Sequence, residues 1–247
     1  MDKNYYTEYY SLERENWWFK VRAAIIIERL EKIIPSSPNL QILNIGAATG
    51  RTSELLSRFG EVTSVEYDKA CCDFTNEKLG MHIINASITE LPFAAASFDV
   101  VCAFDVIEHV ENDVLAVQEM KRVCKSSGTL AITVPAFQQL WSQHDVVNHH
   151  FRRYVMPKLA GLFQPDTDNI VYKTYFNTLL FPLIWIFRRI SNWFPVKRTG
   201  AGSDFSVIGK KSVFNPVLFQ LFNLEKMLLR YFSFPFGVSI LICWKKP

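Results

Sequence analysis

Apolar and polar residues alternate in blocks over residues 41–133, and the blocks differ in length and composition. Short runs rich in Val, Ile and Phe predict strands at 41–45, 62–66, 82–84, 98–104 and 129–134. Longer amphipathic stretches predict helices, as at 51–59 and at 112–125, where Asn112 can cap and one face holds Val114, Val117, Met120 and Cys124. Unbroken apolar strands are typical of strands buried on both faces. We therefore predict a doubly wound, mostly parallel α/β sheet that binds ligands at the carboxyl ends of its strands.

The pattern changes after residue 135. A polar, histidine-rich loop at 138–154 precedes a predicted helix (157–163) and strand (170–175), and a final strand is predicted at 238–244. The segment between these two strands is rich in Phe, Leu and Trp, carries basic residues, and is interrupted by proline and glycine. We predict four units: an N-terminal helical lid (1–40), a ligand-binding core (41–175), a helical hydrophobic and basic insertion (176–236) and the last strand of the core sheet (237–247).

The composition restricts the size of the domain and the cellular compartment of the protein. At 247 residues and 49% hydrophobic content, the chain can bury a sizeable core as one elaborated domain. Its five cysteines are odd in number and form no CxxC pair, so we expect buried thiols in a reducing compartment, without a disulfide framework or a zinc site. Residues 1–22 lack the apolar core of a signal peptide. The apolar run 174–187 is interrupted by Asn177 and Pro182 and falls short of the roughly 20 residues that cross a bilayer. We expect a cytoplasmic protein, soluble or peripheral at the inner face of the membrane.

Charge is distributed unevenly. Residues 1–150 contain 13 Lys and Arg against 20 Asp and Glu, a net charge of −7, whereas residues 151–247 contain 14 against 4, a net charge of +10. A part that is both basic and apolar suits an anionic membrane surface or a lipid-linked anionic ligand. A solvated basic face over an ordinary core is the alternative.

The first predicted strand runs into a turn of small residues with the pattern Gly46-x-Ala48-x-Gly50. Such a turn lets a ligand lie against the backbone near the amides of the following helix, which favours a nucleoside-like or phosphate-like group. A dinucleotide site would have G-x-G-x-x-G, so the spacing argues against NAD. Glu66 ends the next strand about 20 residues later, where a carboxylate can accept hydrogen bonds from ribose hydroxyls. A solvated surface glutamate is the alternative interpretation.

Five further motifs follow in order: Glu66 itself, Leu-Pro-Phe at 91–93, Ser-Phe-Asp-Val-Val at 97–101, Asp-Val-Ile-Glu-His-Val at 105–110 and Arg-Val-Cys-Lys-Ser-Ser-Gly at 122–128. Together with the turn, they resemble the motifs of class I S-adenosylmethionine-dependent methyltransferases. The Leu-Pro-Phe and Glu-His elements are most similar to the type 11/12 group, which includes quinone-biosynthesis O-methyltransferases. The resemblance covers residues 41–135. It implies a seven-stranded Rossmann-like methyltransferase fold and S-adenosyl-L-methionine as cofactor. Asn44 and Ala48 depart from the acid and the glycine usual in that group.

The resemblance also implies which residues bind the cofactor. Gly46, Ala48 and Gly50 would pass along its methionine part, and Glu66 would bind the ribose. Tyr67 would flank the adenine, Ser87 and Ile88 would meet its edge, and Phe104 would approach from the end of the fourth strand, although Phe104 also suits a core position. The aromatic N-terminal segment resembles a lead-in of related enzymes, in which Arg22 would pair with the amino-acid carboxylate of the cofactor. A helix that merely covers the sheet is the alternative.

Two clusters could serve the chemistry. Asp105, Glu108 and His109 have i, i+3, i+4 spacing and would share a helical face. Two carboxylates and an imidazole could hold Mg²⁺ or a similar ion, but the face suits a helix-capping and loop-bracing set better, so we assign no metal ligand and leave the metal question open. His109 is a candidate catalytic residue.

The second cluster lies in the histidine-rich loop. His144 next to Asp145 could be an oriented base, with His150 nearby, and Arg152, Arg153 and Tyr154 could bind a phosphate or carboxylate of the substrate. This loop resembles a signature of a bacterial subgroup linked to cell-surface glycan or polyprenyl-lipid chemistry.

We therefore predict an S-adenosylmethionine-dependent methyltransferase that methylates an oxygen of an amphipathic or lipid-linked acceptor, such as a glycan-lipid, polyprenyl or quinone-like molecule. The alternatives are an NAD-dependent oxidoreductase of similar topology and a catalytically silent cofactor-binding scaffold. The insertion could be a membrane contact, a cap over a small acceptor or a dimer interface. We expect no nucleic-acid partner.

Overall fold

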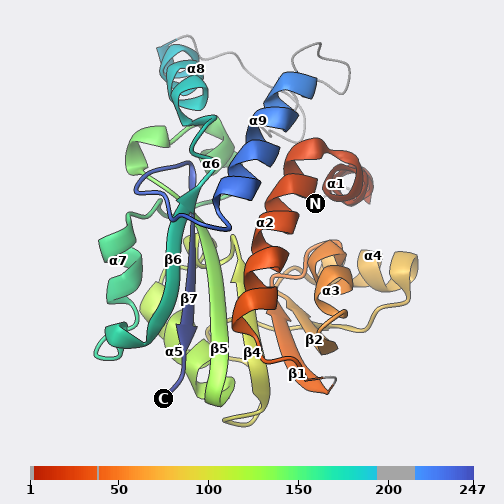
Figure 1. Cartoon of the computed structure of the whole chain (residues 1–247). Helices are drawn as coiled ribbons and strands as arrows, with labels where there is room; N and C mark the ends of the chain where they lie inside the picture. Colours follow the sequence, from red (N-terminus) through yellow and green to blue (C-terminus); the bar gives the residue numbers. More distant parts are fainter. Residues whose placement is uncertain (1–2, 38, 194–214) are drawn as a thin grey trace.

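A computed structural model describes residues 3–37, 39–193 and 215–247. Its centre is a seven-stranded sheet with the strand order β3-β2-β1-β4-β5-β7-β6 (Figure 1). The strands are β1 (Leu40–Ile45), β2 (Gly60–Glu66), β3 (Ile83–Asn85), β4 (Phe98–Phe104), β5 (Cys124–Pro135), β6 (Ile170–Phe176) and β7 (Ser239–Lys245). Strands β1 to β5 are parallel, and β7 pairs antiparallel with both β5 and β6. The predicted doubly wound, mostly parallel seven-stranded fold is confirmed.

The central strands are buried along almost their whole length. Residues 100–104 of β4 and 129–134 of β5 are all buried, as expected for strands covered by helices on both faces. Because the strands are parallel, β1, β2, β4 and β5 all end at the same edge of the sheet. The polar residues that follow these strand ends are therefore brought together at this edge.

Helices cover both faces of the sheet. They are α1 (Lys3–Glu15), α2 (Trp17–Ile33), α3 (Arg51–Leu56), α4 (Lys69–Leu79), α5 (Asp113–Val123), α6 (Gln143–Val147), α7 (Met156–Gly161), α8 (Phe181–Trp193) and α9 (Asn215–Leu228), with short 3-10 turns η1 (Ile107–His109), η2 (Gln138–Leu140) and η3 (Thr167–Asn169). Helices α2 and α9 contribute Leu30 and Phe222 to the core on one face. Helix α5 and the residues after α7 contribute Met120 and Phe163 to the core on the other.

The predicted apolar face of the helix before β5 is wrong at both ends. Helix α5 buries Ala116, Val117 and Met120, whereas Val114 is 47% exposed. Cys124 lies outside the helix and begins β5. The Asn112 cap is present, because its side chain accepts a hydrogen bond from the amide of Leu115.

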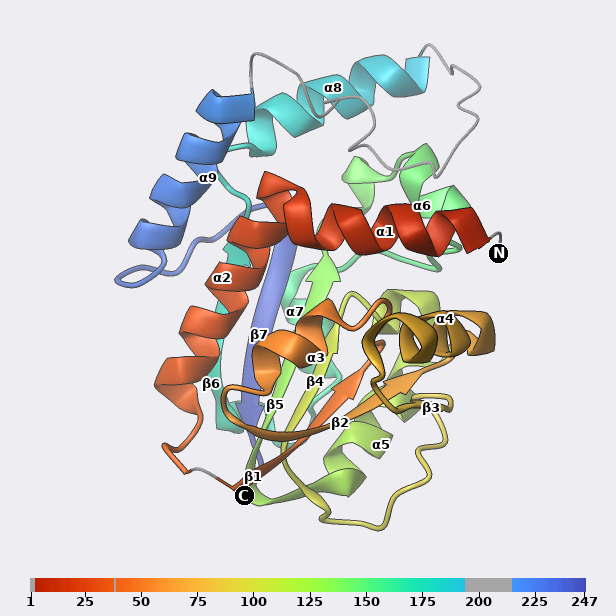
Figure 2. The ribbon, with the colours of Figure 1, turned by 90° about the vertical axis from the view of Figure 1, so that its right-hand side faces the viewer.

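The two N-terminal helices have different positions. Helix α2 packs into the core through Val21, Ile25 and Leu30, so it is part of the folded body. Helix α1 instead runs across the carboxyl edge of the sheet, above α3 and α4 (Figure 2). Of the predicted lid at 1–40, only α1 has a covering position.

The predicted insertion contributes α8 and α9, and its basic residues Lys197 and Arg198 lie outside the described residues. No helix in the part of the chain that the structure describes is both long and apolar enough to cross a membrane. All five cysteines are buried and unbridged, as predicted.

Candidate active site at the carboxyl edge of the sheet

The small-residue turn after β1 has a backbone that accepts little side-chain bulk. Gly46, Ala48 and Gly50 have φ angles of 73°, 46° and 82°, in the left-handed region. A Cβ on Gly46 would lie 2.4 Å from Cγ2 of Val106. Glycine is therefore required at this position both by conformation and by space.

Asn44 connects the strand before the turn to the neighbouring helix and strand. Its amide donates a 2.8 Å hydrogen bond to Oγ of Ser53 in α3, and Ser53 is 2.8 Å from Oγ of Ser64 in β2. The uncharged residue at this position therefore still connects β1, α3 and β2.

Glu66, at the end of β2, faces this turn. Its Oε2 accepts a hydrogen bond from the amide of Ala48 (3.0 Å) and its Oε1 accepts one from the amide of Asp68 (3.0 Å). A carboxylate has about four acceptor positions, so these two bonds fix its orientation and leave positions for a diol. The turn and Glu66 together fit a ribose-bearing cofactor.

The other predicted cofactor residues are spread around the same edge. Tyr67 is 78% exposed, beside Glu66, whereas Ile88 and Phe104 are buried. The hydroxyl of Ser87 lies 2.8 Å from that of Thr89. Tyr67 is thus free to stack on a planar group, while Phe104 is mainly a core residue.

Helix α1 is attached to the turn by polar contacts. The Glu13 carboxylate accepts a hydrogen bond from the hydroxyl of Thr49. Arg14 donates to the Thr49 carbonyl (3.2 Å) and pairs with Glu54 of α3 (2.5 Å). Burial raises the pKa of Glu13 to about 7, although Thr49 and the arginine charges act in the opposite direction. Sequence reasoning missed Glu13, because nothing in its local pattern shows that its partner is a turn 36 residues away.

Arg22 of α2 reaches the ends of β4 and β5. Its Nη2 lies 2.6 Å from Oδ2 of Asp105 and 2.9 Å from Oγ1 of Thr133. Thr133 also donates to Oδ1 of Asp105 (3.0 Å). Thr133 was not predicted, although a polar residue near the carboxyl end of an apolar strand is a usable signal. These contacts fix the Arg22 guanidinium at the carboxyl ends of β4 and β5.

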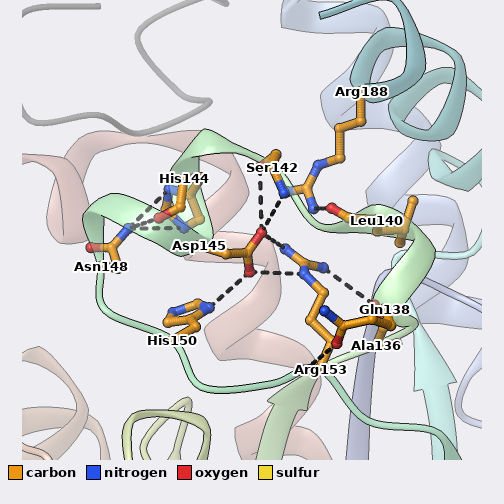
Figure 3. A network of polar contacts seen from close by, with 10 residues as sticks. All are labelled: Ala136, Gln138, Leu140, Ser142, His144, Asp145, Asn148, His150, Arg153 and Arg188. Atoms are coloured by element: carbon orange, nitrogen blue, oxygen red, sulfur yellow. Dashed lines mark hydrogen bonds and ion pairs between the residues drawn. The ribbon is translucent and has the colours of Figure 1, made fainter. Parts of the chain in front are cut away.

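Asp145 is the centre of a buried polar network (Figure 3). It accepts hydrogen bonds from the Ser142 amide (2.8 Å) and from Nε and Nη2 of Arg153 (2.8 and 3.0 Å), and Nδ1 of His150 lies 2.8 Å from its Oδ1. Burial alone would raise the pKa of Asp145, but the His150 bond and the Arg153 charge lower it well below its usual range. Asp145 is thus ionised.

The predicted pairing of Asp145 with His144 differs from the observed contacts. Asp145 orients His150, whereas the ring of His144 lies 3.1 Å from the side-chain amide of Asn148. Neighbouring residues on a helix point in directions roughly 100° apart, so His144 and Asp145 diverge.

The predicted substrate-binding residues have internal partners. Arg153 is buried on Asp145, and the Tyr154 hydroxyl donates to Asp113 (2.8 Å) in a fully buried position. Arg152 pairs with Asp113 (2.8 Å) and donates to the Glu111 carbonyl (2.6 Å). The contacts of Arg152 and Tyr154 hold the loop against the start of α5, and those of Arg153 hold it against α6.

The predicted face of Asp105, Glu108 and His109 is not formed, because the segment is only the three-residue turn η1 and Asp105 pairs with Arg22. Glu108 and His109 instead lie beside His150, and one possible ligand atom from each lies within 4.8 Å of the others. Burial and Asp105 raise the pKa of Glu108 well above its usual range. Burial, reinforced by His150, lowers the pKa of His109 to about 4, so its ring is neutral at pH 7.

Residues 43–132 match a family described as a methyltransferase domain. The chain is 31% identical, over 126 residues, to a probable S-adenosylmethionine-dependent methyltransferase of Mycobacterium tuberculosis, a match that covers 50% of this chain and 44% of that protein. It is 26% identical over 149 residues to the ubiquinone/menaquinone biosynthesis C-methyltransferase UbiE of Vibrio vulnificus, covering 55% and 56%. The chain therefore spans about half the length of these curated relatives.

Solved structures with a similar fold include a methyltransferase. A putative methyltransferase of Bacillus halodurans superposes with a TM-score of 0.56 at 15% identity, covering 90% of this chain and 98% of the other. At that identity the similarity concerns the fold alone.

Proposed function

Because the chain contains a class I S-adenosylmethionine-dependent methyltransferase domain of the type 11 group, we propose that it transfers a methyl group from S-adenosyl-L-methionine to an oxygen of an amphipathic or lipid-linked acceptor. The assignment of the cofactor rests on one observation. The turn at residues 46–50 holds the Glu66 carboxylate beside it through the amide of Ala48. A dinucleotide oxidoreductase is not favoured, since neither the turn spacing nor the relatives point to NAD.

The chain's own residues would position the cofactor. Bound S-adenosyl-L-methionine supplies a methyl group on a positively charged sulfur. Glu66 would hold the ribose hydroxyls, and Arg22, aimed by Asp105 and Thr133, would pair with the amino-acid carboxylate. Transfer to a neighbouring nucleophile then depends mainly on alignment, which a fixed turn favours.

An oxygen acceptor must lose its proton, and His144 is our candidate for the base. It lies on α6 beside the carboxyl end of β5, and its ring centroid is 6.0 Å from that of His150. It is half-buried, so that it can exchange protons with solvent. Asp145 and His150 would position the loop that carries it.

Helix α8 supports the amphipathic nature of the acceptor. Its exposed apolar side chains are Leu183, Trp185, Ile186, Phe187 and Ile190. The buried guanidinium of Arg188 donates to the carbonyl of Leu140, which ties α8 to the loop before α6. An apolar surface joined to the proposed acceptor site suits an acyl or prenyl chain, and the basic C-terminal part suits contact with an anionic membrane.

Calorimetry tests the cofactor. We expect S-adenosylhomocysteine to bind and NADH not to bind; tight binding of NADH alone would overturn the assignment. Flotation with anionic liposomes at low and high salt tests the membrane contact, which salt should weaken. Absence of binding at both salt concentrations would contradict it.

The acceptor is tested with S-adenosyl-L-methionine carrying a ¹³C-labelled methyl group, supplied with quinone, polyprenyl and glycan-lipid fractions. We expect the labelled product to show an O-methyl resonance. A C-methyl resonance would favour the carbon chemistry named for the UbiE relative. His144→Ala should abolish turnover without changing S-adenosylhomocysteine affinity, whereas His82→Ala, an exposed histidine at the far side of the sheet, is the control.

A further inference from the structure

Two segments distant in sequence bring Glu108, His109 and His150 together. Glu108 and His109 lie in η1, just after β4, and His150 lies in the loop after α6. The amide of Phe151 donates a 2.8 Å hydrogen bond to the carbonyl of Glu108, so the backbone itself fixes the His150 loop against η1. The rings of His109 and His150 meet edge to face, with centroids 4.5 Å apart.

Glu108 lacks the partners that a buried carboxyl group needs. Its side chain is fully buried, and neither carboxylate oxygen has a hydrogen-bond partner within the described ranges of the chain. Two positive charges act on the Glu108 carboxyl group, those of Arg22 and Arg153. Both guanidinium groups are already paired, Arg22 with Asp105 and Arg153 with Asp145. An unpartnered buried carboxyl group is costly and calls for an explanation such as an ion.

His150 is held as metal ligands usually are. A ligating histidine typically hydrogen-bonds a carboxylate or a carbonyl through its other ring nitrogen. Nδ1 of His150 lies 2.8 Å from Oδ1 of Asp145, which leaves Nε2 for a ligand.

We propose that Glu108, His109 and His150 bind a divalent transition-metal ion. Two imidazole nitrogens and one carboxylate oxygen are ligands that Zn²⁺ accepts, as do Co²⁺ and Fe²⁺, whereas Mg²⁺ and Ca²⁺ prefer oxygen ligands. Three protein ligands leave at least one coordination position for water or another ligand. The site does not depend on the proposed methyl transfer.

The test uses the untagged chain of residues 1–247, stripped of metal with a chelator and titrated with Co²⁺. We expect one equivalent to bind and to produce visible d–d absorption bands, which one equivalent of Zn²⁺ should abolish. X-ray absorption at the zinc edge should then report two imidazole ligands and oxygen ligands. This measurement needs no variant, so it holds even where a substitution prevents folding.

Variants assign the site. Glu108→Gln and His150→Gln should each weaken Co²⁺ binding more than tenfold while circular dichroism stays native. Asp145→Asn should weaken it roughly 10- to 100-fold, as observed for residues that orient ligands. His149→Asn is the matched control: His149 is exposed and has a φ angle of 56°, which asparagine tolerates.

Two results would overturn the proposal. One is the lack of stoichiometric Co²⁺ and Zn²⁺ binding by the wild-type chain, which would leave a neutral Glu108 beside two histidines. The other is unchanged binding by folded Glu108→Gln and His150→Gln. Neither result would affect the methyltransferase proposal, which is tested by S-adenosylhomocysteine binding and turnover.

Discussion

Arg22 and Asp105 form an ion pair, with Nη2 of the arginine 2.6 Å from Oδ2 of the aspartate. Arg22 lies on α2, which packs in the core, and Asp105 follows β4, so two rigid elements fix the guanidinium group. The pair joins the N-terminal helices to the proposed cofactor edge.

We predict that Arg22→Met weakens S-adenosylhomocysteine binding roughly 10- to 100-fold, because hydrogen bonds to charged groups contribute about 1.5–3 kcal/mol. Calorimetry measures the affinity. Arg29→Met is the matched control, since Arg29 lies on the same helix but contacts Tyr172 and the carbonyl of Leu229. Equal affinities of Arg22→Met and wild type would refute the role of Arg22.

Glu66→Ala should have a larger effect on the same measurement. It removes the proposed ribose acceptor and also leaves the amides of Ala48 and Asp68 without their partner. We expect at least a hundredfold loss of affinity and a fall of about 1–3 kcal/mol in the free energy of unfolding. Glu61→Ala, at the exposed start of β2, should change neither quantity. A Glu66→Ala variant with wild-type affinity would show that the ribose lies elsewhere.

The attachment of α1 should depend on pH. Because the pKa of Glu13 is raised from 4.5 to about 7, folding favours its protonated form. Between these two values the unfolded chain loses the proton first, so stability falls as the pH rises from about 4.5 through about 7, by at most about 3 kcal/mol. Arg14 and Arg22 reduce this effect, and Glu54 increases it.

Urea unfolding across this pH range measures how the free energy of unfolding changes with pH. Hydrogen exchange shows whether the change arises in α1. Glu13→Gln should remove this fall in the free energy of unfolding with rising pH. Glu8→Gln, at an exposed position of the same helix, should leave the fall unchanged. Identical slopes in the wild type and in Glu13→Gln would contradict the prediction.

Gly46→Ala should destabilise the fold more than Gly80→Ala. Both glycines have positive φ angles, which cost about 1–2 kcal/mol for other residues. Only at Gly46 would the new Cβ also meet a neighbour, Cγ2 of Val106 at 2.4 Å, whereas nothing lies within 4 Å at Gly80. Adding Val106→Ala should recover part of the loss at Gly46. If the two alanine variants unfold at the same urea concentration, the contact with Val106 carries no energy.

The approximate limits of the seven strands could be predicted because apolar runs and turn residues are local signals. Residues 98–104 were predicted with the observed limits of β4, while β5 begins five residues earlier than predicted. Its start, at Cys124, was assigned to the preceding helix, since an amphipathic pattern does not show where the chain leaves the helical conformation.

The pairing inside the site could not be predicted in the same way. Asp145 contacts His150 because His149 adopts a left-handed conformation and the amide of His150 bonds back to the carbonyl of Asp145 (2.9 Å). Neither the left-handed turn at His149 nor the approach of Glu108 from the turn after β4 is visible in residue spacing. The residues of the cluster were therefore recognisable, but their partners were not.

The contacts of α1 have a kinetic consequence. Glu13, Arg14 and Tyr6 attach this helix to Thr49, Glu54 and Asp68, on both sides of the turn where the nucleoside would lie. Exchange of spent for fresh cofactor would then require α1 to detach first, a unimolecular opening whose rate does not rise with cofactor concentration. We therefore expect turnover to reach a ceiling set by helix opening rather than by the transfer step.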